Sequence, residues 1–202
     1  MATKAGRLEY GVAAPKYRLP DATHIGRVRL QVSDLGRSLD YYQRVLGLRV
    51  LETSGNRAVL GAQQGDAPLV ELHAHTGVRS VPRHGLLGLY HYAILLPDRA
   101  SLGRFLRHLG ELGVRAGMSD HFVSEAVYLQ DPDNLGIEVY ADRPRSEWRH
   151  EQGQLSMATI PLDASVVARA NSAEAVGPPT MIAWTVRARP NVGSSSRARL
   201  AC

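Results

Sequence analysis

His91 and Glu138 have the residue types and the surroundings of metal ligands. His91 stands at the start of an apolar run, and Glu138 lies inside another, residues 135–140. A carboxylate among apolar side chains costs free energy unless a cation or hydrogen-bond donors compensate it. Imidazole and carboxylate are both ligands of divalent metals. The pair would supply half of such a site, although a lone strand histidine is more often a hydrogen-bonded structural residue.

The positions of these two residues depend on an internal repeat. Residues 25–34 and 89–98 are both β-type runs that end at an aspartate able to cap a following helix. Apolar residues at helical spacing then fill residues 35–46 and 102–112, and each helix is followed by a glycine, Gly47 or Gly113, suited to a left-handed C-cap. Three short strand candidates follow each helix: 49–53, 57–61 and 68–75 in the first unit, and 114–118, 126–131 and 136–141 in the second.

The repeat predicts an α+β fold of two tandem βαβββ modules, which form a half-open curved sheet around a cleft. Each module is too small to bury its own sheet, so the two should pack together. We expect an N-terminal extension at 1–21, the paired domain at 22–142, a connector at 143–175 with a helix over 162–175, and a disordered Arg/Ser/Pro-rich tail at 176–202. The register of the repeat places Arg27 opposite His91 and Glu71 opposite Glu138.

The composition limits the classes of function. A chain of 202 residues that is 44% hydrophobic and 21% charged can bury the core of one substantial domain. Its single cysteine, Cys202, excludes an internal disulfide framework and fits a reducing compartment. No stretch has the length of a signal-peptide apolar region or of a membrane helix, so we expect a cytoplasmic protein with no membrane partner.

The net charge of +5 and the pI of 9.7 raise the question of nucleic-acid binding. Four of the 24 Lys and Arg residues, but none of the 19 Asp and Glu residues, lie in residues 176–202. The rest of the chain is therefore nearly neutral, and a basic tail is usually a solvated appendage. We expect no nucleic-acid partner.

The paired βαβββ units resemble the vicinal oxygen chelate superfamily, which contains glyoxalase I, the bleomycin-resistance proteins and the extradiol ring-cleaving dioxygenases. Residues 121–138, from His121 through Tyr128 and the Asp-Pro-Asp-Asn turn to Glu138, resemble the extradiol signature. Asn134 departs from that signature, since glycine is usual there, and Ser119 departs from it two places before the histidine. Residues 88–97 and 140–144 are most similar to the catechol 2,3-dioxygenase branch.

The resemblance implies an Fe(II) site, or less often a Mn(II) site, with two histidines and one glutamate on one face of the metal. The open positions would take a catechol and O2. The resemblance makes His91 and Glu138 metal ligands, and it makes His121 and Tyr128 groups that hydrogen-bond the substrate oxygens and intermediates. The structural alternatives are a barrel-lining core tyrosine at 128 and a strand-edge histidine at 121.

The third metal ligand is not evident in the sequence. The resemblance places it at the position equivalent to His91, where this chain has Arg27, and a guanidinium cannot ligate a metal. His24 would need a bulge to turn inward, and Glu71 beside Arg27 is more simply an ion-pair partner. Further candidates are His73, His75 and a third module lost after residue 175 by truncation or a frameshift.

Three functions remain open. We expect a metal-dependent extradiol dioxygenase that cleaves a small aromatic diol of the catechol type with O2, in an active, inactive or truncated form. One alternative is a metal-free binding module like the bleomycin-resistance proteins, which incomplete ligation favours. The other is a glyoxalase-like lyase, which needs four inward ligands and is disfavoured by Arg27. An unpartnered sheet face also predicts a homo-oligomer.

Overall fold

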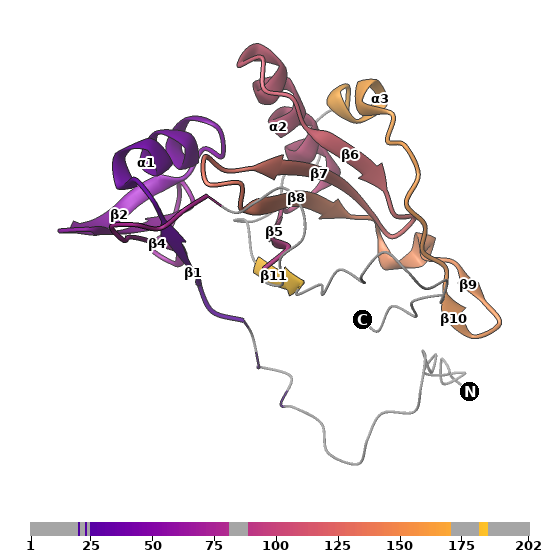
Figure 1. The fold of residues 1–202 in the computed structure, drawn as a ribbon. Helices are drawn as coiled ribbons and strands as arrows, with labels where there is room; N and C mark the ends of the chain where they lie inside the picture. The colour runs from indigo at the N-terminus through magenta and orange to yellow at the C-terminus, as the bar shows by residue number, and fades with distance from the viewer. Residues whose placement is uncertain (1–19, 21–22, 24, 81–88, 171–181, 186–202) are drawn as a thin grey trace, which may run out of the picture.

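Two βαβββ units follow each other along the chain (Figure 1). The computed structural model describes residues 20, 23, 25–80, 89–170 and 182–185. Module 1 consists of β1 (Val28–Val32), α1 (Leu35–Arg44), β2 (Arg49–Ser54), β3 (Arg57–Gly61) and β4 (Pro68–Ala74). Module 2 consists of β5 (His91–Leu95), α2 (Arg99–Glu111), β6 (Gly117–Asp120), β7 (Ser124–Gln130) and β8 (Gly136–Asp142). The predicted α+β fold with two tandem modules is confirmed.

Each module forms a sheet of its own. The strand order is β1-β4-β3-β2 in module 1, and it is β5-β8-β7-β6 in module 2 with one further strand, β11 (Ile182–Thr185), beside β5. In both modules the first strand pairs in parallel with the last, β1 with β4 and β5 with β8, while the remaining pairs are antiparallel. In Figure 1 both α1 and α2 lie above their sheets, so the two helices cover the same side of the paired modules.

The same local signals start and end both helices. Asp34 caps α1 by accepting a hydrogen bond from the Arg37 N–H at 2.8 Å, and Asp98 caps α2 by accepting one from the Ser101 N–H at 2.6 Å. Gly47 and Gly113 follow the helices with φ of 70° and 66°, in the left-handed region that favours glycine. The predicted caps and C-terminal glycines are therefore confirmed.

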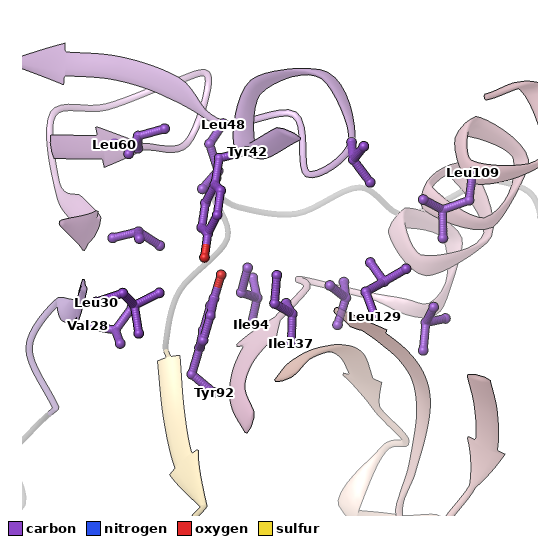
Figure 2. Packing of buried hydrophobic residues seen from close by; sticks show 14 of the residues in the cluster. Val28, Leu30, Tyr42, Leu48, Leu60, Tyr92, Ile94, Leu109, Leu129 and Ile137 are labelled. Carbon is purple, nitrogen blue, oxygen red and sulfur yellow. The ribbon is translucent and has the colours of Figure 1, made fainter. Parts of the chain in front are cut away.

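The helix-bearing faces of the two sheets share one apolar core. Along β1, the side chains of Val28, Leu30 and Val32 are buried and alternate with exposed ones, as expected for a strand with one face in the core. Figure 2 shows the hydroxyl ends of Tyr42, from α1, and Tyr92, from β5, pointing toward each other. Both rings are fully buried, so α1 of module 1 meets the first strand of module 2 at the centre of the core.

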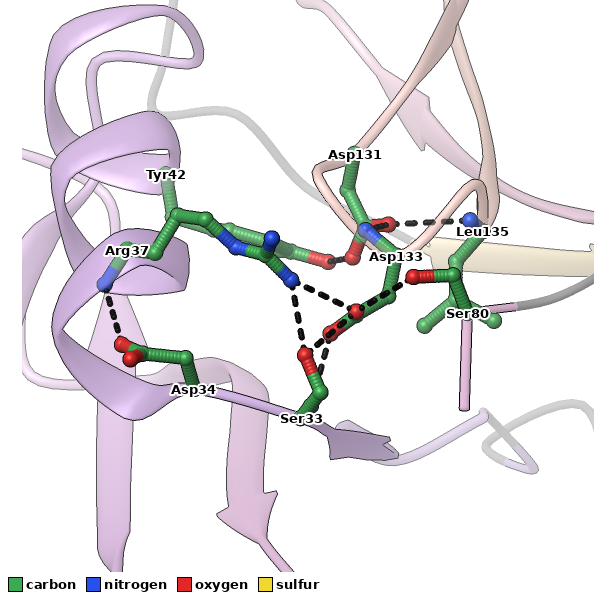
Figure 3. Close-up of polar contacts among 8 residues, drawn as sticks. All are labelled: Ser33, Asp34, Arg37, Tyr42, Ser80, Asp131, Asp133 and Leu135. Carbon is green, nitrogen blue, oxygen red and sulfur yellow. Dashed lines mark hydrogen bonds and ion pairs between the residues drawn. The ribbon is translucent and has the colours of Figure 1, made fainter. Parts of the chain in front are cut away.

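A turn of module 2 binds directly to module 1 (Figure 3). The buried carboxylate of Asp133 accepts hydrogen bonds from the Ser33 N–H and hydroxyl, both at 2.7 Å, and from the Arg37 guanidinium at 2.8 Å. The Tyr42 hydroxyl donates to Asp131 at 3.1 Å. These contacts make an inter-module clasp whose members are Ser33, Arg37, Tyr42, Ser80, Asp131 and Asp133.

The clasp shifts the pKa values of its two carboxyl groups in opposite directions. Burial alone would raise the pKa of Asp133, but hydrogen bonds from Ser33 and Ser80 and the charge of Arg37 outweigh burial and lower it. Burial raises the pKa of Asp131, and the hydrogen bonds that it accepts offset this only in part. As the pH falls, Asp131 should therefore take up a proton before Asp133 does.

Several predicted boundaries were wrong. The strand predicted at 114–118 begins at Gly117, because the Val114 N–H still donates to the Leu109 carbonyl at the end of α2, at 2.9 Å. The helix predicted over 162–175 is α3 (Ala164–Ala168), and residues 171–175 lie outside the described residues. The sequence did not predict η1 (Arg145–Glu147) or the hairpin of β9 (His150–Glu151) and β10 (Gln154–Leu155).

The proposed terminal segments fall largely on undescribed residues. Of the N-terminal extension, only residue 20 is described, and of the predicted disordered tail, only residues 182–185 are. Those four residues form β11, a strand that the sequence did not predict, which pairs along the edge of β5. An edge strand offers unpaired N–H and C=O groups to such a segment. Among the helices described, none is both long enough and apolar enough to cross a bilayer.

Candidate active site

His91 and Glu138 lie on the face of the second sheet that points away from the core. The parallel pairing of β5 and β8 sets His91 beside Gly136 and Ala93 beside Glu138, so both side chains project from the same face. Nε2 of His91 lies 2.8 Å from Oε2 of Glu138, and the two side chains are 11% and 13% exposed. The structure brings the two predicted metal ligands into contact.

Tyr128 and His121 extend this pair. Tyr128 on β7 is the direct cross-strand neighbour of Glu138, and its hydroxyl donates to Oε1 of Glu138 at 3.0 Å. His121 lies between β6 and β7, with Nε2 2.7 Å from the Tyr128 hydroxyl oxygen and Nδ1 2.7 Å from the carbonyl oxygen of Ala158. The four predicted site residues therefore form one contact chain, ordered His91, Glu138, Tyr128, His121.

The hydrogen atoms of the contact chain have two consistent arrangements. The Ala158 carbonyl only accepts, so Nδ1 of His121 carries a hydrogen. When the single Tyr128 hydroxyl hydrogen points to Glu138, Nε2 of His121 must carry a second hydrogen to complete its bond to Tyr128. When that hydroxyl points to His121 instead, the imidazole is neutral. The phenol thus connects the carboxylate to the imidazole in both arrangements.

Aromatic rings flank His91. Its ring centroid lies 5.1 Å from that of Tyr90 and 5.8 Å from that of Tyr128. The approach of β8 to β5 at this point requires Gly136, because a Cβ there would lie 2.9 Å from Cβ of His91 and would press on the Tyr90 carbonyl. The Tyr90 side chain is partly exposed, so an aromatic surface next to the site faces solvent.

The loop that carries His121 is held in an unusual backbone conformation. Phe122 has a φ of 68°, which bulky residues rarely adopt, and its N–H donates to Oδ1 of Asp120 at 2.8 Å. Arg143 lies 2.6 Å from the other oxygen of Asp120 and 3.0 Å from the buried carboxylate of Glu125. The sequence analysis missed these supporting residues, although a glutamate inside the apolar run 123–129 was a signal for them.

Module 1 has an ion pair at the equivalent positions. Nε of Arg27 lies 2.5 Å from Oε2 of Glu71, and the register of β1 and β4 relates the two residues as that of β5 and β8 relates His91 and Glu138. The predicted repeat register and the predicted Arg27–Glu71 ion pair are confirmed. Hydrogen bonds from His73 and Arg57 lower the pKa of Glu71 to about 2, so side chains of its own module already bind this carboxylate.

The described residues do not complete a metal site with three protein ligands. No group of three His, Cys, Asp or Glu side chains among them is placed to hold a metal. Glu71 and His73 contact each other, and His24 lies outside the described residues. Nδ1 of His91 is buried without a hydrogen-bond partner in the described part of the chain. His91 and Glu138 thus fit two positions of a metal site, and the third position has no described candidate.

Comparison with known proteins assigns the fold to a family. Residues 24–139 match the family described as the Glyoxalase/Bleomycin resistance protein/Dioxygenase superfamily. The chain belongs to this superfamily. A solved structure in it, a glyoxalase/dioxygenase from Nostoc punctiforme, aligns with a TM-score of 0.52 at 20% identity, covering 65% of this chain and 100% of the other. That similarity supports the paired-module fold.

Two relatives in the superfamily differ in their reactions. The chain is 46% identical over 142 residues to a catechol-2,3-dioxygenase of Bacillus subtilis (strain 168), covering 70% of this chain and 50% of that protein. It is 35% identical over 129 residues to a lactoylglutathione lyase of Haemophilus influenzae, covering 56% of this chain and 89% of that protein. The chain therefore spans about half the length of the dioxygenase relative and most of the lyase relative.

One departure from the dioxygenase signature has a structural explanation. Asn134, at the place where the superfamily's dioxygenases usually have glycine, has a φ of 63°. Asparagine is one of the few residues with a side chain that adopts this left-handed conformation readily. The left-handed turn before Glu138 therefore forms here without a glycine.

Proposed function

We propose that module 2 carries the active site of a metal-dependent extradiol dioxygenase that cleaves a catechol-type aromatic diol with O2. The observation that carries the proposal is the contact chain, in which an imidazole and a carboxylate meet a phenol and a second imidazole on one sheet face. The 46% identity to a catechol-2,3-dioxygenase favours this reaction over others of the superfamily.

The proposed cofactor is Fe(II) or Mn(II), held in part by His91 and Glu138. Both side chains are nearly buried, and they are the ligand types of a two-histidine, one-carboxylate site. When bound, the metal would supply the Lewis acidity and the electron transfer that ring cleavage with O2 requires. The third ligand would come from outside the described residues, with His24 and a further module as the candidates.

The residues of the chain itself would position the carboxylate and handle protons. The Tyr128 hydroxyl binds Oε1 of Glu138, which orients the carboxylate so that Oε2 faces His91. In the other arrangement, with the Tyr128 hydroxyl pointing to His121, Nε2 of His121 carries no hydrogen and would take up, through that hydroxyl, the proton that a diol hydroxyl loses on binding, while Nδ1 still donates to the Ala158 carbonyl. A positioned acid–base group of this kind contributes typically ~10²–10⁴-fold to a rate.

A metal-free binding module of the bleomycin-resistance type is the second candidate. It is favoured by the Arg27–Glu71 ion pair, which fills the position where a ligand from module 1 would be expected. The same ion pair argues against a lyase that takes metal ligands from both modules, despite the identity to lactoylglutathione lyase.

Anaerobic reconstitution separates these candidates. The full chain is purified without O2, loaded with Fe(II) and assayed for bound metal, and catechol is then added under O2 while the yellow ring-fission product is followed. The proposal predicts bound metal and product formation in the wild type and in His150→Ala, an exposed control histidine. Both should be lost in His91→Ala. A wild type that neither binds metal nor turns over catechol would favour the binding module.

A further inference from the structure

The face of the first sheet that points away from the core carries a cluster of basic side chains. β1 pairs Arg29 with Glu71, and β3 pairs Arg57 with His73, so these side chains project from one face together with Arg27. We call this set the basic cluster; it consists of Arg27, Arg29, Arg57 and His73 around Glu71.

Glu71 does not use the full donor capacity of the cluster. The Glu71 side chain is 4% exposed. Its Oε1 lies 2.9 Å from Nε of Arg57 and 2.6 Å from Nε2 of His73. Oε2 faces Nε of Arg27 at 2.5 Å and Nε of Arg29 at 3.4 Å. Within the described part of the chain these are the only ion pairs of Arg27 and Arg29, and both use Nε. The Nη groups of the two arginines have no protein acceptor there.

The cluster also carries surplus positive charge. Its three guanidinium groups face two carboxylates, Glu71 and the Glu52 that binds Arg57 at 2.9 Å. Arg27 and Arg29 both approach the same carboxylate oxygen, so one negative charge is shared between two positive ones. The Arg29 side chain is 66% exposed, which leaves it accessible from solvent.

We propose that the basic cluster is a binding site for a small oxyanion, a carboxylate or a phosphate, held by the Nη groups of Arg27 and Arg29. A guanidinium presents its donors in a planar fork that matches two oxygens of a carboxylate or a phosphate. The site occupies in module 1 the position that the His91–Glu138 pair occupies in module 2, with the preferred charge of the ligand reversed. It needs neither the metal nor the reaction proposed for module 2.

Calorimetric titration of the full chain tests the site with benzoate, inorganic phosphate and the neutral analogue benzamide. We expect benzoate or phosphate to bind with a Kd of about 1 mM. Arg29→Gln should weaken that binding about tenfold, which corresponds to the loss of roughly 1.4 kcal/mol. Arg115→Gln, which removes an exposed arginine outside the cluster, should leave it unchanged. Whichever of benzoate and phosphate binds more tightly shows whether the site prefers a carboxylate or a phosphate.

Two further variants locate the bound anion. Glu71→Gln removes the competing negative charge and should tighten binding severalfold, a direction that damage to the fold would not produce. His91→Ala should leave benzoate binding intact, because the module 2 site is not involved. Equal affinities in Arg29→Gln and Arg115→Gln, benzamide binding as tight as benzoate binding, or no heat from either anion would overturn the proposal.

Discussion

Arg27 and His91 occupy equivalent positions in the two modules. Each contacts a glutamate on the last strand of its own module, at 2.5 Å for Arg27 and Glu71 and at 2.8 Å for His91 and Glu138. The guanidinium keeps its charge at every ordinary pH, whereas an imidazole exchanges a proton or binds a metal. The two modules thus share a geometry and differ in its chemistry, and of the two equivalent pairs only His91 and Glu138 in module 2 consist of two possible metal ligands.

Replacing Tyr128 with phenylalanine tests the contact chain. Tyr128→Phe removes the hydroxyl that joins Glu138 to His121 and leaves the ring in place. Under the proposed function, kcat for catechol should fall by ~10²–10⁴-fold, as for loss of a positioned acid–base group. Tyr41→Phe, on α1, is the matched control and should keep the wild-type rate. An unchanged rate in Tyr128→Phe would remove this residue from the proposed chemistry.

The inter-module clasp should contribute measurably to stability. Asp133→Ala leaves the donors of Ser33, Arg37 and Ser80 without their shared acceptor. We expect the free energy of unfolding in urea to fall by about 3 kcal/mol, since a buried charged hydrogen-bond partner is lost. Asp40→Ala breaks only an exposed pair with Arg44 and should cost about 0.5 kcal/mol or less. Equal losses in the two variants would contradict a clasp centred on Asp133.

Acid should destabilise the protein partly through Glu71. The pKa of its carboxyl is lowered to about 2 by His73 and Arg57, below the value of about 4.3 for a glutamate in an unfolded chain. A lowered carboxyl pKa gives stability that is present above the unfolded value and is lost as the pH falls toward the folded one. The free energy of unfolding should therefore decline from about pH 4.5 to about pH 2.

Two variants separate the contribution of Glu71 from that of other carboxylates. Denaturation curves across this pH range should be flatter for Glu71→Gln than for the wild type, because the variant has no carboxyl group to protonate. Glu111→Gln, at the exposed end of α2, should retain the wild-type slope. Parallel curves for Glu71→Gln and the wild type would show that the ion pairs of Glu71 do not govern the acid response.

Gly136 should be intolerant of any side chain. A Cβ at this position would lie 2.9 Å from Cβ of His91, so β8 would have to move away from β5. We expect Gly136→Ala to cost about 1–3 kcal/mol of stability, as overpacking does, and to lower metal occupancy by separating His91 from Glu138. At Gly117 a Cβ would meet that of Tyr128 at an ordinary 3.5 Å, so Gly117→Ala serves as the control. A fully stable Gly136→Ala protein would refute the tight contact.

The repeated modules were predictable because local signals determine them. Asp34 and Asp98 cap the helices, and a glycine follows each helix, so both helices could be located within a few residues. The register of the repeat then matched Arg27 with His91 and Glu71 with Glu138. The clasp was not predictable, because Asp133 meets Ser33 across 100 residues of sequence and no local pattern encodes that contact. β11 was missed for a similar reason, since its pairing depends on the edge of β5 rather than on its own composition.

The site was predictable only in part. The apolar neighbours of Glu138 indicated a carboxylate with a partner, and the structure supplies His91 and Tyr128. The roles of His121 and Tyr128 came from the resemblance alone and stay predictions. The contact of His121 with the Ala158 carbonyl could not be predicted, because every residue has a backbone carbonyl and the sequence does not show which one serves as the acceptor.

The buried contacts of Tyr42 with module 2 have a consequence for how the chain acquires its structure. Tyr42 belongs to the first helix, but its hydroxyl hydrogen-bonds Asp131, 89 positions later. During synthesis, most of the paired region must therefore leave the ribosome before the Tyr42 hydroxyl can bind Asp131. Until then, the core-facing apolar surface of module 1 is exposed. The smallest unit that folds cooperatively should be the pair, so a fragment ending near residue 80 should aggregate or bind chaperones rather than persist as a stable half.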